Sequence, residues 1–254
     1  ATVTTFKALA QDLGMPEETV DAFDCYYDAV HPDFLRWTQT RDGPRRQWRN
    51  RRIGPTHAAM LEQFNQDGGR QKLLAWFTLP PTLLNGVETR LRAVRGDAGR
   101  LTERELNDAM TAVVAAILQC CPLRRENLAE LRLGSDHGSG LGPNLYVPGA
   151  TERNRPARIA LADHEVKNRQ GMTVLASELA TRALRVYRDR IRPEIRRRRG
   201  SDPSNPHLFP GLGRDERPHG KHTRDYRERA WAAGFWLDLH CNRHLTAKIV
   251  LDRD

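Results

Sequence analysis

The feature of this sequence that most constrains its fold is a run of apolar residues at helical spacing between Thr102 and Pro122. The run comprises Leu106, Met110, Val113, Val114, Ile117 and Leu118. Residues three and four positions apart share one side of an α-helix, so the run forms an apolar stripe. Thr102 and Glu105 match a capping box, which opens a helix, and a proline disfavours helical backbone in the residue before it. The sequence therefore predicts an amphipathic helix that begins after Thr102 and ends near Pro122.

Helical spacing of apolar residues predicts further helices along the chain. Residues 1–96 show this spacing in several places, and other helices are expected to begin around Arg125 and after Ser177. The Ser177 hydroxyl is suited to capping a helix, because it can accept a hydrogen bond from a backbone N–H of the first turn. We expect that helix to end before Pro193 and to be followed by a charged, flexible loop over residues 196–206.

Glycine and proline residues interrupt the helical pattern between residues 134 and 156. Three short segments in and after this region have the composition of β-strands, namely residues 144–147, 158–161 and 172–175. Short apolar and β-branched runs that are bounded by turn residues are typical of strands. The expected fold class is therefore mainly α with a small antiparallel β-sheet.

A linker is indicated by residues 95–100, which place two glycines between charged residues. At 254 residues the chain is long enough for two domains that each bury a core. We therefore predict a helical region over residues 1–96 and a second domain over residues 97–254.

The charge of the chain indicates a polyanionic partner. Lysine and arginine together number 41 against 32 aspartates and glutamates, which gives a net charge of +9. Such an excess attracts nucleic acid. The basic segment 41–52 is a candidate for contacts with the DNA backbone, although a run of charges is also typical of a solvated surface. Its candidate DNA-binding residues are Arg45, Arg46, Arg49, Arg51 and Arg52.

Cysteine usage and hydropathy indicate the compartment. The four cysteines form no CxxC pair and no dense framework of the secreted kind. No apolar run approaches the roughly 20 residues that a membrane span needs, and the N-terminus shows no signal-peptide pattern. We therefore expect a soluble cytoplasmic protein that is associated with the nucleoid when it binds DNA.

Three separated segments carry residues that are suited to phosphate chemistry. Arg124 stands where a helix is expected to begin, and Lys167 lies in a turn between two strand candidates. His240 and Arg243 form a His-x-x-Arg pattern, and residues three apart share one face of a helix. A guanidinium group grips phosphate oxygens in a bidentate manner, which an ammonium group cannot do. Each motif is common alone, so their order and separation along the chain are the informative features.

Together these motifs resemble the catalytic domain of the tyrosine recombinases, the family of phage-type integrases and site-specific recombinases. The resemblance covers residues 97–254, and Leu131, Leu208-Phe-Pro210 and His244 also match residues common in that family. It implies the family's DNA breaking-rejoining catalytic fold, preceded here by a helical region that looks like part of a core-binding domain. It also implies DNA recombination or integration on behalf of a phage or another mobile element, with His244 as a further candidate for contacting DNA.

The resemblance implies a role for each side chain. Arg124 and Arg243 would form a clamp that stabilises the negative charge developing on the attacked phosphodiester, with no metal and no cofactor. Lys167 would be the general acid that protonates the departing 5′ oxygen, and His240 would hydrogen-bond the phosphate. A tyrosine would form a 3′-phosphotyrosine intermediate. The implied partner is double-stranded DNA, bound by a homotetramer, with no membrane and no small-molecule substrate.

Two departures from the family's pattern affect this interpretation. All five tyrosines precede His240, whereas the family's nucleophile follows it, so we expect the nucleophile to lie outside this chain. Asn127 stands three residues after Arg124, where relatives often have an acid. The parent protein would then be an enzyme, of which this chain alone lacks the nucleophile. The alternative is a catalytically inactive relative that binds DNA as a regulator or architectural factor, and a basic regulator unrelated to recombinases is a third hypothesis.

Plainer interpretations of these residues stay open. Arg125 is the alternative to Arg124 at the helix start, and a lysine such as Lys167 is common in any polar turn. His240 and His244 have the spacing of a metal-binding pair, but no second pair of ligands stands at a suitable spacing, so we predict no metal site. The apolar residues expected to pack in the core include Trp76, Phe77, Leu79, Trp231, Phe235 and Trp236.

Overall fold

The computed structural model describes residues 55–251, except positions 137, 139, 153, 167 and 168. Contacts divide the chain into two compact units, of which the first comprises Ala1–Glu62 with His244–Asp254 and the second comprises Gln63–Arg243. Most of the described residues belong to the second unit. Among the described residues, no helix has both the length and the apolar character needed to cross a lipid bilayer.

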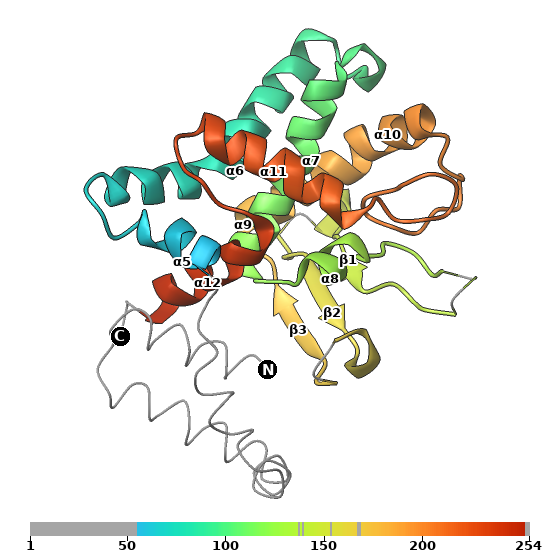
Figure 1. Ribbon diagram of the computed structural model, residues 1–254. Coiled ribbons are helices and arrows are strands. Elements are labelled where there is room, and N and C mark those ends of the chain that lie inside the picture. Colours follow the sequence, from blue (N-terminus) through green and yellow to red (C-terminus); the bar gives the residue numbers. More distant parts are fainter. Residues whose placement is uncertain (1–54, 137, 139, 153, 167–168, 252–254) are drawn as a thin grey trace, which may run out of the picture. The chain divides into compact units, whose positions relative to one another are not determined.

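Helices make up most of the described chain (Figure 1). They are α5 (Pro55–Glu62), α6 (Gly69–Ala93), α7 (Glu103–Cys120), α8 (Arg125–Ala129), α9 (Glu178–Val186), α10 (Arg192–Arg199), α11 (His219–Ala232) and α12 (Leu239–Leu251). Short helical turns are η1 (Ala98–Arg100), η2 (Ala150–Glu152), η3 (Asp163–Glu165) and the π-helical η4 (Tyr187–Ile191). The strands are β1 (Leu145–Tyr146), β2 (Arg158–Leu161) and β3 (Met172–Leu175).

Helix α7 lies inside the second unit, where α6, α9, α11 and η4 pack against it (Figure 1). Every residue from Ala109 to Leu118 is buried, which is typical of a helix with neighbours on all sides. The helix starts with the predicted capping box. The Thr102 hydroxyl accepts a hydrogen bond from the Glu105 amide at 3.2 Å, and the Glu105 carboxylate accepts one from the Thr102 amide at 2.7 Å. It ends at Cys120, close to the predicted end.

The sheet has three strands in the order β1-β2-β3, and both neighbouring pairs are antiparallel. In the central strand, Ile159 pairs with Leu145 on one side and with Val174 on the other. Ile159, Leu145 and Leu161 are buried, because alternate residues of a strand point to the same face. These helices and this sheet confirm the predicted fold class, mainly α with a small antiparallel β-sheet.

The helix that follows Ser177 continues past Pro193, so the predicted helix end is wrong, and the predicted loop over residues 196–206 is wrong for residues 196–199. The Ser177 hydroxyl caps the helix as predicted, accepting a hydrogen bond from the Ala180 amide at 3.2 Å. The chain then passes through η4 into α10, where Pro193 lies in the first turn and its missing N–H costs little. Residues 196–199 are therefore helical. Helix α10 ends at Arg199 and is capped by Gly200, whose φ of 62° suits a residue without a Cβ atom.

Arginines of α10 attach neighbouring loops to this helix. The Arg192 Nε atom donates a hydrogen bond to the carbonyl of His207 at 2.9 Å. The Arg198 guanidinium donates to the carbonyl of Leu101 at 2.7 Å, just before α7. Residues that composition alone assigns to a solvated, DNA-attracting surface thus also hold the second unit together.

The core prediction for the aromatic residues is partly wrong. Trp76 and Phe235 are each 2% exposed, as predicted for the core. Phe77, Trp231 and Trp236 are instead 40%, 72% and 41% exposed. The sequence places aromatic residues on helices, but only the neighbours of each helix decide which of them face the core.

Glu194 in α10 has an unusually acidic carboxyl group. It accepts hydrogen bonds from Arg197 at 2.8 Å and from Arg198 at 2.6 Å. The hydrogen bonds from Arg197 and then from Arg198, together with their charges, outweigh the effect of burial and lower the pKa of Glu194 to about 2. The ionised form is thus favoured in the folded protein more than in the unfolded chain.

We predict that Glu194→Gln flattens the dependence of stability on acid pH. An unperturbed glutamate has a pKa of about 4.3, so ionised Glu194 contributes its stabilisation above that pH. The contribution is lost as the pH falls toward the folded-state pKa of about 2. The free energy of unfolding, measured with urea between about pH 6 and about pH 3, should fall less steeply in the variant. Glu178→Gln, an exposed change on α9, is the matched control, and equal slopes for E194Q and wild type would contradict the prediction.

Candidate functional site

Arg124 and Arg243 come from distant parts of the sequence and lie close together in the second unit. Arg124 occupies the N-cap position of α8, where the backbone is extended. Arg243 lies on α12, and its Nε atom donates a hydrogen bond to the carbonyl of Pro122 at 2.8 Å. Pro122 stands two residues before Arg124, and both arginine side chains are half-buried. The structure thus brings together the two arginines that we predicted to act as a pair.

The two guanidinium charges act on each other. Burial lowers the pKa of Arg243, and the positive charge of Arg124 lowers it further, while Glu126 opposes the effect. Two cations held close together in a partly desolvated place create a positive potential there. A bound anion relieves this repulsion, so the arrangement favours a phosphate-like group.

The surroundings favour Arg124 over Arg125 as the arginine of this site. Arg125 is exposed and forms an ion pair with the adjacent Glu126, with 2.7 Å between Nε and Oε1. By contrast, the charge of Arg124 is the one that lowers the pKa of Arg243.

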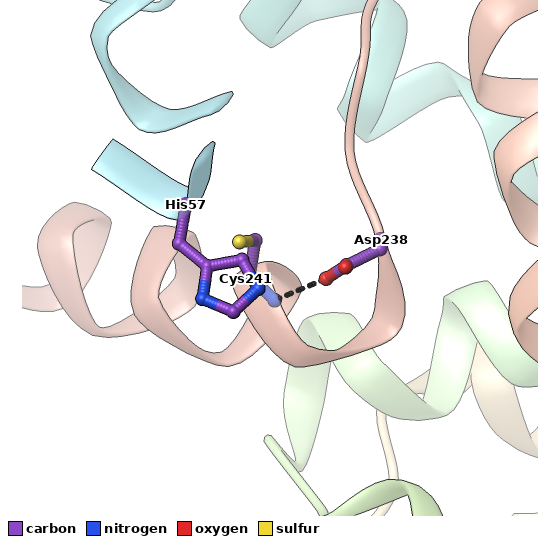
Figure 2. A group of neighbouring side chains, drawn as sticks. All are labelled: His57, Asp238 and Cys241. Atoms are coloured by element: carbon purple, nitrogen blue, oxygen red, sulfur yellow. Dashed lines mark hydrogen bonds between the residues drawn. The ribbon is translucent and has the colours of Figure 1, made fainter. Parts of the chain in front are cut away.

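Asp238 fixes the start of α12, the helix that carries His240 and Arg243. Its Oδ1 atom accepts a hydrogen bond from the amide of Cys241 at 2.7 Å (Figure 2). Its Oδ2 atom accepts one from Arg227 of α11 at 3.0 Å. A carboxylate in this position satisfies a backbone donor and interacts favourably with the helix dipole. His240 is exposed and shares a face of the helix with Arg243, which lies three residues later.

Asn242 anchors α12 in the core and was not predicted. Its side chain is 0% exposed. The Oδ1 atom accepts hydrogen bonds from the Trp76 indole at 2.7 Å and from the Tyr226 hydroxyl at 2.8 Å. The Nδ2 atom donates to the carbonyl of Leu118 at 3.3 Å. These partners belong to α6, α11 and α7, so the residue before Arg243 is held by three helices at once.

Tyr226 is the tyrosine nearest in sequence to His240, and its surroundings do not suit a nucleophile. The side chain is 0% exposed, and the hydroxyl is engaged by Asn242. Burial raises the pKa of Tyr226, which disfavours the phenolate form that attacks phosphorus. The residue instead contributes to the packing of α11 against α12.

Several of the predicted site residues lie outside the described part of the chain. These are Lys167, Arg45, Arg46, Arg49, Arg51 and Arg52. The connection between β2 and β3 is described as far as Val166 and again from Arg169. His244 is the next residue after Arg243 in α12, and its side chain is buried. Its contact with DNA stays a prediction.

Comparison with known proteins gives no family. No protein-family model and no curated protein sequence matches the chain. A solved structure to which it is similar is that of XerA recombinase, with a TM-score of 0.39 and 16% sequence identity over 99% of this chain and 84% of that one. A score this low does not establish a shared fold, and we assign no family on this likeness.

We predict that Asn242→Ala lowers the free energy of unfolding by about 2–4 kcal/mol, because it leaves the buried donors of Trp76 and Tyr226 without their acceptor. Urea denaturation measures the change. Asn85→Ala, on the exposed side of α6, is the matched control and should change stability by less than about 0.5 kcal/mol. Equal effects of the two substitutions would show that the Asn242 amide does not hold the helices together.

Proposed function

We propose that this chain is the phosphate-activating part of a tyrosine recombinase, which recombines DNA by cleaving and rejoining strands through a 3′-phosphotyrosine intermediate. The observation that carries the proposal is the pair formed by Arg124 and Arg243. These residues are 119 positions apart in the sequence, and a bound anion would stabilise the two like charges that the fold brings together. The net charge of +9 supports double-stranded DNA as the source of that anion.

In the proposed reaction, the two arginines act on the phosphodiester. Attack by a tyrosine oxygen adds negative charge to the non-bridging oxygens, and guanidinium groups that are already in place stabilise it. His240, exposed on the same face of α12 as Arg243, would donate a hydrogen bond to the same phosphate. The bond from phosphorus to the 5′ oxygen breaks as the bond to tyrosine forms, and Lys167 would supply the proton to the departing oxygen.

The nucleophile in this proposal is a tyrosine outside the chain, since every tyrosine of the sequence precedes His240. The basic residues Arg45, Arg46, Arg49, Arg51 and Arg52, together with His244, are proposed to contact DNA. Assembly as a tetramer on DNA and a role in a phage or other mobile element belong to the same proposal. A catalytically inactive DNA-binding relative is the other outcome that the following experiment tests.

We predict that the protein produced from the gene up to its natural stop codon forms a covalent adduct with nicked suicide DNA. The duplex should carry a site that the protein has itself selected from random DNA. Arg124→Ala should lower the rate of adduct formation by about 100-fold or more, because it removes a preorganised donor to the developing charge. The adduct is measured by denaturing gel electrophoresis, and its attachment site by mass spectrometry.

Arg125→Ala is the matched control, since it removes an exposed arginine next to the site and should leave the rate close to that of the wild type. Equal losses in the two variants would contradict the assignment of Arg124. Specific DNA binding without any adduct, in a protein that contains a downstream tyrosine, would refute the proposed reaction and favour the inactive relative.

A further inference from the structure

Glu165 stands at the end of η3, in the connection between β2 and β3, and its carboxylate is buried and fully engaged. The Oε1 atom accepts hydrogen bonds from the Arg132 guanidinium and from the Asn144 amide, the latter at 2.9 Å. The Oε2 atom accepts one from the backbone amide of Ala162 at 2.9 Å. The side chains of Arg132 and Glu165 are only 4% and 8% exposed. This ion pair is therefore part of the interior.

Arg132 extends the network to the chain around it. Its Nε atom donates to the carbonyl of Gly142 at 3.0 Å, and its backbone amide donates to the Asn144 side chain at 2.6 Å. The Asn144 side chain also donates to Glu165, so Arg132, Asn144 and Glu165 form a closed set of hydrogen bonds that includes the Arg132 backbone amide. A network in which every buried polar group has a partner allows a single arrangement of the chain.

Asn127 connects this network to the helix that follows Arg124. Its side chain is 8% exposed, and its Nδ2 atom donates to the backbone carbonyl of Glu165 at 2.6 Å. Asn127 is the third residue of α8, for which Arg124 is the N-cap. Glu165 is thus held at both ends, through its carboxylate by Arg132 and through its carbonyl by Asn127.

A buried ion pair of this kind is a costly way to gain stability. Removing two charges from water offsets most of their attraction, and apolar residues of similar volume often stabilise a fold as well or better. Directional hydrogen bonds do what apolar contacts cannot, because they fix the position and orientation of the backbone that they reach. Here the backbone that they reach includes that of Ala162 and Glu165, as well as that of Gly142.

We propose that Glu165 and Asn127 are positioning residues, which fix where the β2–β3 connection starts relative to the helix that Arg124 precedes. The inference rests on the proposed function, in which Lys167, two positions after Glu165 in the sequence, is the general acid. Neither Glu165 nor Asn127 touches the DNA in this scheme. They act through the part of the chain that delivers the proton to the 5′ oxygen as its bond to phosphorus breaks.

The scheme makes the effect of substitution depend on the leaving group. A 5′ oxygen needs a proton in order to depart, whereas a 5′ sulfur in the same bridging position is a far better leaving group and departs as a thiolate. A variant in which only proton delivery is impaired should therefore recover its activity on the sulfur-containing substrate. A variant with a damaged fold or a damaged phosphate clamp should be impaired on both.

The test uses the full-length gene product and two suicide duplexes, one with the natural 5′ oxygen and one with a bridging 5′ sulfur at the scissile phosphate. Asn127→Ala removes the hydrogen bond to the Glu165 carbonyl and leaves the ion pair intact. Glu165→Gln replaces one acceptor oxygen by a donor that faces other donors. Both variants should form adduct about tenfold or more slowly than wild type on the oxygen duplex and within about threefold of wild type on the sulfur duplex.

Glu152→Gln, a change of the same chemistry on η2 with no bond to α8, is the matched control and should behave as wild type on both duplexes. Circular dichroism and DNA affinity verify that each variant is folded, and N127A tests the inference should E165Q fail to fold. Equal slowing on both duplexes, or no slowing on either, in a folded N127A would overturn the positioning role alone. A wild-type protein that forms no adduct on either duplex would overturn the proposed function and this inference with it.

Discussion

The arrangement of helices around the candidate site depends on one buried amide, that of Asn242. A polar side chain without access to water is tolerated only when its hydrogen bonds are made, and Asn242 makes them with Trp76, Tyr226 and the Leu118 carbonyl. Each partner belongs to a different helix. The hydrogen bonds of Asn242 thereby fix the position of α12, in addition to apolar packing. They also fix the position of Arg243, which is the next residue in the helix.

The segment from Pro122 to Arg132 links this helix cluster to the sheet. At its beginning, the Pro122 carbonyl accepts a hydrogen bond from Arg243. In its middle, Asn127 holds the Glu165 carbonyl, and at its end Arg132 pairs with the Glu165 carboxylate. A single short stretch of chain therefore contacts both α12 and the β2–β3 connection. A movement of α8 would therefore displace both α12 and the β2–β3 connection. A site assembled from remote parts of a sequence needs such a shared support to keep its side chains in position.

Periodicity and capping signals predicted the local structure well, because they depend on near neighbours in the sequence. The capping box of Thr102, the Ser177 cap and the three strands are of this kind. The predicted helix end before Pro193 was wrong because the proline falls in the first turn after a π-helical turn, which no short sequence pattern indicates. Asn242 could not be predicted either, since its role is set by three partners that are remote in the sequence. The pairing of Arg124 with Arg243 was predictable only through the resemblance to a family, and the division at residue 96 stays a prediction.

The arginine that begins α10 has a consequence for how the protein would approach a polyanion. Arg192 donates hydrogen bonds to the backbone carbonyls of Asn205 and His207, which carry no net charge to cancel its own. Its charge therefore still contributes to the long-range field, although its hydrogen-bonding capacity is largely committed. Such residues speed the diffusional encounter at low ionic strength without gripping the partner afterwards. Association rates would then depend on salt more steeply than a count of direct contacts suggests.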